Sequence, residues 1–328
     1  MKIEDVIAKC VETPGISVKQ EKYFCEMLLN TKEGTGSMTF LPLFPGITLA
    51  YISIDAPTWP APQLAENGSN VKGPLLINYC IQGRCELVLN NDSYVYVTDG
   101  QLSLTERFAQ NQYIYPRRLY QGLELFLDVD STTAAPYLAD SLGLFLPRLA
   151  ESYCPDGKTY IAQAGTSVET LFHTLWGLAG KRNDYALFQM RMGVLSLLGA
   201  LLYETHIPPS RTCTFYTESQ VAIAKKTEAI ITADLRKHHP AWELAAAFSI
   251  SETSLKNYFR GVFGQNLSVY LQELRMNRAA DLLVSTRLSV AAIAEQVGYT
   301  NQSKFAHVFK RKFGVSPLEY RRHSRLAP

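Results

Sequence analysis

The sequence predicts an α+β protein of two domains, with a β-rich domain first and an all-α domain last. Three observations support this prediction. A unit of roughly 50 residues occurs twice within residues 242–322, and both copies have helical periodicity. Short segments rich in β-branched and aromatic residues follow one another between residues 43 and 128. Finally, residues 216–328 carry 16 Lys/Arg and 9 Asp/Glu, a net charge of +7, whereas residues 1–215 carry 16 and 21, a net −5.

The repeat is visible in the order of its apolar residues. Its first copy consists of 244–248, a polar turn, Phe259, 263–264 and Tyr270; its second consists of 293–297, a polar turn, Phe309, 313–314 and Tyr320. The offset between the copies is 49 residues at the start and 50 from Phe259 onward. The second copy therefore has one additional residue in its turn.

Each copy is typical of a helix-turn-helix motif. In the first, 242–248 is a short helix, 249–251 is the turn, and Ser251 is suited to cap the next helix. In the second, Ser289 caps 290–297 and Gly298 ends that helix in a left-handed conformation. The second helix of each copy has a buried stripe at helical spacing. The stripe residues are Leu255, Tyr258, Phe259, Val262 and Phe263 in one copy, and Phe305, Val308, Phe309 and Phe313 in the other.

The opposite face of each second helix is polar and basic. Short polar side chains near the start of a helix and cations along its length suit the major groove, where amides and cations meet base acceptors and phosphates. These candidate DNA-binding residues are Thr253, Lys256, Asn257 and Arg260 in the first copy, and Gln302, Ser303, Lys304, His307, Lys310 and Arg311 in the second.

One long helix, 269–284, is predicted between the copies. Sixteen residues of helix span roughly 24 Å. A rigid helix of that length could hold two recognition helices about one DNA turn apart, roughly 34 Å, on one face of a duplex. We therefore expect one polypeptide to enter two consecutive major grooves.

The region 217–325 resembles the DNA-binding domain of the AraC/XylS family of transcription regulators. The resemblance is closest in the second half, at 293–294, 297–299, Ser303, Phe305, 308–310, 313–314, 316–317 and 320–321. It implies that Thr253, Lys256 and Asn257, and then Gln302, Ser303, Lys304 and His307, contact bases. Glu252 departs from the basic character of this surface. It either accepts a hydrogen bond from a cytosine amino group or favours the positive N-terminus of its helix, and we favour the second role.

The sequence predicts a domain at 1–206, a linker at 207–216 that contains Pro208 and Pro209, and a DNA-binding domain at 217–328. In the first domain, residues 1–39 are expected to be helix and loop. Strands are expected at about 40–130 and helices at about 133–206. The expected strands are 47–54, 74–81, 85–89, 93–97, 101–104, 112–115 and 122–128, with turns at 82–83, 90–92 and 99–100. The expected helices are 137–149, 168–179 and 185–205. Residues 81–89 and 96–100 resemble a cupin-like β-barrel or jelly-roll sensor domain.

Cupins raise an enzymatic alternative. A metal-dependent cupin needs imidazole and carboxylate ligands on its strands, but the first histidine of the chain is His173, beyond every strand named. No nucleophile elbow, phosphate loop or dinucleotide motif is present. Glu86, Glu124 and Asp128 are interpreted as solvated carboxylates. We therefore expect no enzyme activity, no metal site and no cofactor.

A barrel with an aromatic interior could instead bind a small organic effector. The residues that could line it are Tyr51, Trp59, Tyr79, Tyr94, Tyr96, Tyr113 and Tyr115, with Arg84 as a partner for an anion, but no ligand residue can be assigned. The broad apolar stripe of 185–205 packs either within the subunit or against a second copy, and the resemblance implies a dimer contact in these helices.

The start of the chain has no secretory signal, and its most apolar run, 192–203, is too short to span a bilayer. The six cysteines contain no C-x-x-C pair and are expected to be reduced thiols; a redox switch at Cys80 and Cys85 is the alternative. We therefore expect a cytoplasmic homodimer that binds double-stranded DNA, responds to an effector, contacts RNA polymerase and does not associate with a membrane. The alternative is a ligand-independent regulator whose first domain serves dimerisation or protein contacts.

Overall fold

A computed structural model describes residues 13–60, 74–89, 93–106, 112–128, 136–204 and 214–326. The chain folds as two compact units, residues 1–215 and 216–328. The predicted turn at 90–92, most of the predicted linker, Cys10 and Cys213 lie outside the described residues. The α+β class with a β-rich unit followed by an all-α unit is confirmed.

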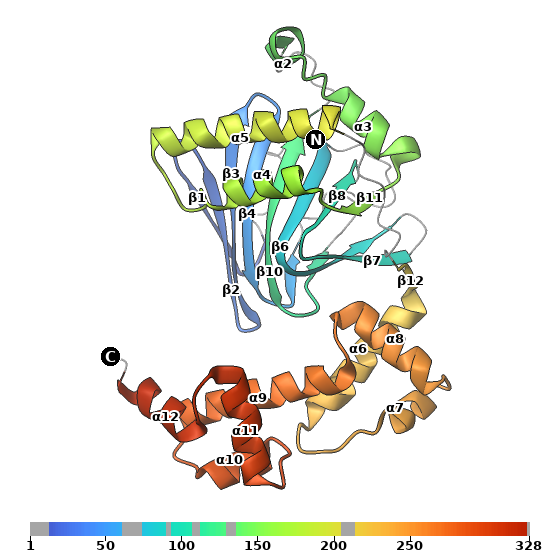
Figure 1. Cartoon of the computed structure of the whole chain (residues 1–328), viewed down its shortest axis with the longest axis vertical. Coiled ribbons are helices and arrows are strands. Elements are labelled where there is room, and N and C mark those ends of the chain that lie inside the picture. The colour runs from blue at the N-terminus through green and yellow to red at the C-terminus, as the bar shows by residue number, and fades with distance from the viewer. Residues whose placement is uncertain are drawn as a thin grey trace. The chain divides into compact units, whose positions relative to one another are not determined.

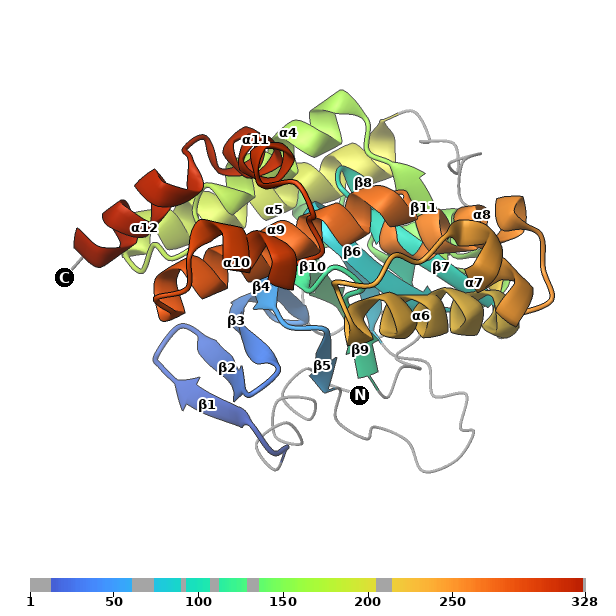
Figure 2. The same ribbon diagram turned by 90° about the horizontal axis from the view of Figure 1, so that it is seen from below.

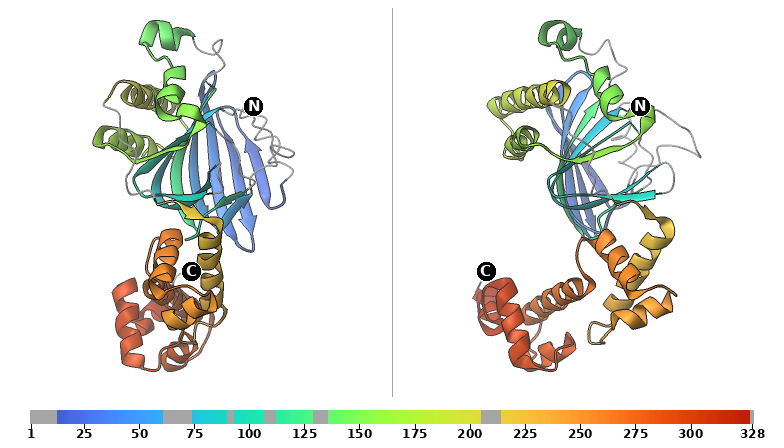
Figure 3. Two further views of the ribbon diagram at one scale, coloured as in Figure 1. Left: turned by 90° about the vertical axis from the view of Figure 1, so that its right-hand side faces the viewer. Right: turned by 45° about the vertical axis from the view of Figure 1, so that its right-hand side comes forward.

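The N-terminal unit is built on a curled antiparallel sheet (Figures 1 and 3). Its strands are β1 (Ile16–Gln20), β2 (Cys25–Thr31), β3 (Gly34–Phe44), β4 (Ile47–Asp55), β5 (Thr58–Pro60), β6 (Leu75–Val88), β7 (Ser93–Thr98), β8 (Gln101–Thr105), β9 (Gln112–Ile114), β10 (Leu119–Leu127) and β11 (Tyr160–Gln163). The spatial order is β1-β2-β3-β4-β10-β6-β7. In addition, β8 pairs with β6 and β11, and β9 pairs with β5 and β6.

The prediction of helix and loop before residue 40 is wrong for the described part. Strands β1, β2 and most of β3 occupy that region. Strand β2 shows the reason, because Cys25, Met27 and Leu29 alternate with more exposed residues and pack into the core. The period of two was present in the sequence, but few β-branched residues accompany it.

The two strands predicted at 74–81 and 85–89 form one strand, β6, and the predicted turn at 82–83 lies inside it. Gly83 has a φ of 109°, and the register with β10 shifts between Gln121 and Gly122. This irregularity is a β-bulge, which bends a strand without ending it. A Cβ atom at Gly83 would lie 2.1 Å from the carbonyl oxygen of Leu119, so only glycine fits there.

Helices α2 (Pro136–Leu142), α3 (Pro147–Tyr153), α4 (Thr166–Trp176) and α5 (Asp184–Tyr203) follow the strands. The single helix predicted at 137–149 is two helices, because Gly143 turns the chain with a φ of 69° and Pro147 begins α3. The strand β11 was not predicted. Helices α4 and α5 lie side by side and cover one face of the sheet (Figure 3).

The sheet has an apolar core on each face. Leu123, Leu125 and Leu127 of β10 point to the core beneath the helices. Tyr120 and Phe126 of the same strand point to the opposite core, on the face that the helices do not cover. Apolar residues of this strand are therefore buried on both of its faces, although Gln121 and Glu124 interrupt the apolar sequence.

Helix α5 is longer than the apolar run that the sequence suggests. Among the described residues it alone has the length and the mean hydropathy, 1.5, of a membrane span. Its residues Met190, Val194, Leu197, Leu198 and Leu201 are buried in the core beneath the helices. A core helix passes the same test of length and composition.

The C-terminal unit consists of α6 (Glu218–Ala233), α7 (Ala241–Ala247), α8 (Glu252–Phe263), α9 (Leu267–Ser285), α10 (Val290–Gln296), α11 (Gln302–Phe313) and α12 (Pro317–Leu326). Helix α9 joins the group α6–α8 to the group α10–α12 (Figure 2). The prediction of two helix-turn-helix motifs joined by a long helix is confirmed. Helices α6 and α12 were not predicted individually.

The two copies of the repeat also share the geometry of one pair of aromatic rings. Phe259 and Tyr270 meet edge to face with centroids 5.3 Å apart, and Phe309 and Tyr320 do so at 5.4 Å. Each pair fixes the second helix of its motif against the helix that follows, and edge-to-face contacts of this kind are favoured by the ring quadrupoles.

Candidate nucleic-acid interface

The first recognition helix, α8, separates an apolar face from a polar one. The hydroxyl of Ser251 accepts a hydrogen bond from the Ser254 amide at 3.1 Å and caps the helix as predicted. Leu255, Phe259 and Val262 are fully buried. The four candidate residues on the other face, Thr253, Lys256, Asn257 and Arg260, are all exposed.

The second recognition helix, α11, repeats this division. Its N-cap is Asn301, whose side-chain oxygen accepts from the Lys304 amide at 2.9 Å. This cap was not predicted from the sequence, although asparagine directly before a helix is a recognised signal. Phe305 and Phe309 are fully buried and Val308 nearly so. All six candidates are exposed: Gln302, Ser303, Lys304, His307, Lys310 and Arg311.

We call these ten exposed residues the reading surface. Its two halves differ in charge. In α8, the carboxylate of Glu252 forms an ion pair with Lys256 one turn later. The described part of α11 contains no acidic residue, and three of its reading-surface residues are cations, Lys304, Lys310 and Arg311. The positive potential is therefore concentrated on the second half of the reading surface.

The ion pair gives Glu252 a third role, beyond the base contact and the helix N-terminus that the sequence suggests. The carboxylate lies in the first turn of α8, where it also favours the helix dipole. It holds the Lys256 ammonium on the helix surface. Any contact of Lys256 with DNA has to compete with this pair.

Two arginines outside the reading surface donate hydrogen bonds to backbone carbonyls of the C-terminal unit. In α9, Arg275 donates from Nε to the Leu235 carbonyl at 2.8 Å and from Nη2 to the Lys237 carbonyl at 3.2 Å. In α12, Arg321 donates to the carbonyls of Leu283 and Leu288 at 3.2 and 2.7 Å. Their hydrogen-bonding groups face protein carbonyls, so these cations position the motifs.

The aromatic residues proposed for the N-terminal interior do not share one cavity. Tyr51 and Tyr79 lie on the helix-covered face: Tyr51 donates to the Leu175 carbonyl at 2.8 Å, and Tyr79 stacks on Phe172 at 4.3 Å. Trp59 and Tyr115 are buried in the opposite core, with Tyr113 packed against it. Tyr94 is half-buried in β7.

The interpretation of Glu86 as a solvated carboxylate is wrong. Its side chain is buried, and its Oε2 accepts a hydrogen bond from Tyr96 Oη at 2.8 Å. The guanidinium of Arg84 lies 4.7 Å from the centre of the Tyr96 ring. Arg84 therefore makes a cation–π contact within the protein.

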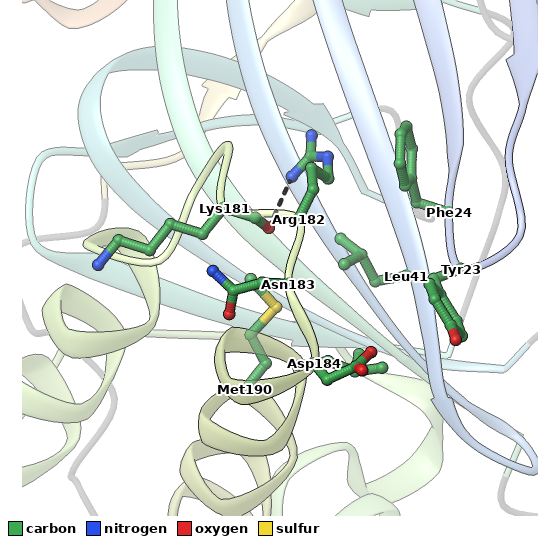
Figure 4. Close-up of a pocket in the computed structure, with 9 residues that line it drawn as sticks. Tyr23, Phe24, Leu41, Lys181, Arg182, Asn183, Asp184 and Met190 are labelled. Atoms are coloured by element: carbon green, nitrogen blue, oxygen red, sulfur yellow. Dashed lines mark hydrogen bonds between the residues drawn. The ribbon is translucent and has the colours of Figure 1, made fainter.

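A pocket in the N-terminal unit opens between the segment preceding β2, strand β3 and the start of α5 (Figure 4). Its cavity volume is about 40 Å³. Arg182 lies 4.4 Å from the centre of the Phe24 ring, and Asn183 caps α5 by accepting from the Ala186 amide at 2.8 Å. These polar groups thus have partners in the protein. The pocket is lined by Tyr23, Phe24, Leu41, Lys181, Arg182, Asn183, Asp184, Leu187 and Met190.

The four described cysteines, Cys25, Cys80, Cys85 and Cys154, are free and buried. Burial raises the pKa of each thiol. A raised pKa lowers the thiolate fraction and hence the reactivity. Within the described ranges, no group of three or more His, Cys, Asp and Glu side chains could hold a metal ion.

Comparisons with known proteins identify the C-terminal unit. A family model described as a helix-turn-helix domain matches residues 244–323. The RCS-specific HTH-type transcriptional activator RclR of Escherichia coli K12 is 38% identical over 104 residues, which are 30% of this chain and 37% of that protein. A putative AraC-like transcription regulator of Streptomyces antibioticus is 37% identical over 81 residues, 25% of this chain and 27% of that protein.

Among solved structures, the C-terminal domain of AraT, a response regulator from Geobacillus stearothermophilus, is similar to this chain at 32% identity. The similarity covers 31% of this chain and 84% of that one, with a TM-score of 0.30. The matched part of the chain spans well under half the length of the two curated relatives described above.

Proposed function

Through its C-terminal unit the chain belongs to the AraC/XylS family of transcription regulators, and we propose that it regulates transcription by entering two consecutive major grooves of one DNA duplex. The observation that carries this proposal is the reading surface. Ten polar and basic side chains on α8 and α11 are exposed, while the opposite faces of both helices are buried. The net charge of +7 on residues 216–328 favours a polyanion as partner.

The spacing between the helices supports simultaneous binding. Helix α9 has 19 residues, which corresponds to about 28 Å of helix. Its two ends pack against the two motifs, through Tyr270 in one and Leu283 in the other. A spacer of this length and rigidity is suited to neighbouring grooves, whose centres are about 34 Å apart.

The two recognition helices take different shares of the binding energy in this proposal. Helix α11 supplies most of the phosphate attraction, because three of its reading-surface residues are cations and no acid is present among its described residues. Helix α8 is more selective, since Lys256 has to leave Glu252 before it meets a base or phosphate. Each well-placed base contact contributes about 1–3 kcal/mol of discrimination.

A salt titration tests the proposal. A duplex selected by the purified protein from a randomised library serves as the probe, and affinity is measured from low to high salt. We expect the logarithm of the association constant to fall linearly with the logarithm of salt concentration. An affinity that does not change with salt would contradict phosphate-driven binding. The double variant Lys304→Ala/Lys310→Ala should reduce the size of the slope by about 2, the value for two lost phosphate contacts, and Lys226→Ala, at an exposed site on α6, should leave it unchanged.

We also propose that the N-terminal unit joins two copies of the chain. Helix α5 exposes Tyr185, Phe188 and Met192 at helical spacing, and these side chains retain 69%, 54% and 42% of their accessible surface. Such a stripe on an otherwise well-packed helix suits self-association. A dimer would place two DNA-binding units on one operator. In this proposal the protein acts in the cytoplasm and contacts RNA polymerase from the bound operator.

Control by a small organic effector is the second part of the proposal for the N-terminal unit. The sheet carries an apolar core on the face away from the helices, with Trp59, Tyr115 and Phe126 among its residues. Effector binding there would change how the two DNA-binding units are placed. Thermal unfolding with and without candidate compounds, followed by DNA binding in their presence, separates this regulator from one that only dimerises.

A further inference from the structure

Glu124 is a carboxylate in the middle of the apolar core on the uncovered face of the sheet. In β10 it lies directly opposite Ala50 of β4 and Asn78 of β6. Opposed residues of antiparallel strands share a face, and Ala50 belongs to that core. Tyr120, four positions before Glu124 in β10, and Phe126, two positions after it, lie on the same face.

Among the described residues, Glu124 has no hydrogen-bond or ion-pair partner, although it retains some accessible surface. The other carboxylate of this region, Glu86, is held by Tyr96. Two polar side chains on the same face are engaged with each other, since Tyr120 Oη donates to Asn78 Oδ1 at 2.7 Å. Protein carboxylates in apolar surroundings are usually paired, so a lone one that remains accessible is a candidate for an external partner.

The apolar surroundings of Glu124 affect its protonation and therefore the charge that a bound partner should carry. Burial raises the pKa of Glu124 to about 8. The carboxyl is therefore mostly neutral at pH 7, and a cation beside it would lower its pKa and ionise it. Burial is also the main cause of the raised pKa of Cys80, Cys85, Tyr115 and Tyr120, which remain neutral in this range. Among the described residues named here, Glu124 is thus the one whose raised pKa lies near neutrality.

The neighbouring side chains also suit an organic cation. Tyr115 and Tyr120 stack with ring centroids 5.1 Å apart, and Phe126 lies on the same face of the sheet. Aromatic rings attract cations through their π faces and accommodate hydrocarbon. A hydrated metal ion would need several oxygen ligands, and no such group gathers among the described residues.

We propose that Glu124 binds the ammonium group of a small organic amine and that this amine is the effector of the regulator. The proposal rests on the proposed function, because it names the chemical class of the effector. The carboxylate pairs with the ammonium group, the NH2 group of Asn78 is available to donate to a polar atom of the ligand, and the aromatic residues pack against its hydrocarbon part.

The test uses the full-length protein and four primary amines of different size: butylamine, putrescine, phenethylamine and tyramine. Phenylethanol and phenylacetate serve as neutral and anionic analogues. Binding is measured by thermal unfolding and by calorimetry at pH 7. At least one amine should bind, and Glu124→Gln should weaken it by at least about tenfold, while Glu86→Gln, which keeps an acceptor for Tyr96, should not. Unfolding temperatures without ligand show that both variants fold.

A second measurement counts the protons that are released when the amine binds. Because Glu124 is mostly protonated at pH 7, binding of an ammonium ion should release close to one proton in the wild type and none in Glu124→Gln. Calorimetry in buffers with different ionisation enthalpies measures this number. The proposal is overturned if none of the amines binds, if phenylethanol binds as well as phenethylamine, or if Glu124→Gln binds amines like the wild type. DNA binding measured on the same samples separates this failure from failure of the proposed function.

Discussion

Ser249 and Gly298 occupy the same position in the two helix-turn-helix turns, and both have left-handed backbone conformations, with φ of 55° and 82°. Only the second turn uses the residue that adopts this conformation without strain. At Gly298 the choice is also enforced by space, because a Cβ atom would lie 2.6 Å from the Leu235 carbonyl oxygen and 2.8 Å from Arg275 Nη2.

This relationship predicts opposite effects of exchanging the two residues. Ser249→Gly should stabilise the C-terminal unit by up to about 1 kcal/mol, because it removes left-handed strain. Gly298→Ser should destabilise it by at least that amount, because it adds strain and displaces Arg275. Urea unfolding of both variants measures the effects. Equal effects of both substitutions, in either direction, would contradict this account of the turns.

The C-terminal unit was predictable because its local signals agree with its packing. Leu255, Phe259, Phe305 and Phe309 recur at helical spacing, and all four are fully buried. Capping by Ser251 and Ser289 could likewise be read from the sequence, and both hydroxyls accept the expected amide hydrogen bonds. Which exposed residues meet DNA remains a prediction, because exposure alone does not place them in a groove.

The N-terminal unit was less predictable because its important features depend on strand pairing. The bulge between Cys80 and Gln82 exists only because β10 passes beside β6, and the sequence pattern alone suggested a turn at 82–83. The position of Glu124 also depends on register, since alternation does not say which face of a strand is covered by helices. Within the described ranges Glu124 lacks a partner because Ala50 opposite it in β4 has no polar side chain and the Oδ1 of Asn78 in β6 is engaged by Tyr120.

The uneven charge of the reading surface predicts unequal salt slopes. Lys310→Ala should reduce the slope of the logarithm of affinity against the logarithm of salt by about 1, the value for one lost phosphate contact. Lys256→Ala should change the slope less, because Glu252 already neutralises Lys256 in the free protein. Fluorescence anisotropy with one duplex at several salt concentrations gives both slopes. A larger change for Lys256→Ala would reverse the assignment of the two helices.

Replacing Glu252 distinguishes its three roles. If the carboxylate mainly restrains Lys256, then Glu252→Gln should tighten binding to all duplexes by a few-fold and make the salt slope steeper. A base-reading role would instead relax the preference for cytosine at one position. A role only at the helix N-terminus would lower the unfolding free energy of the unit by about 0.3–1 kcal/mol and leave DNA binding unchanged. Selection from a randomised library, combined with unfolding curves, separates these outcomes.

Glu124 predicts a pH dependence of stability. Its pKa is about 8 in the folded protein and 4.5 in the reference state. Between these values the folded state retains a proton that the unfolded state has lost, so this residue makes stability fall as pH rises. Glu124→Gln should therefore be more stable than the wild type at pH 8, by several degrees in unfolding temperature, and the difference should shrink towards pH 5. A difference that is constant with pH would show that Glu124 keeps an ordinary pKa.

The exposed stripe of α5 predicts the oligomeric state. Phe188→Asp places a charge at the centre of the stripe, between Tyr185 and Met192, and should raise the dimer dissociation constant by about 30-fold or more, the effect of losing a central apolar contact. Tyr137→Asp is the matched control, because Tyr137 is an equally large exposed aromatic residue on α2. Sedimentation equilibrium of the wild type and both variants gives the constants. If the dissociation constant of Phe188→Asp equals that of the wild type, the dimer contact lies elsewhere. The exposed face of α5 would then not be the surface that brings two DNA-binding units to one operator.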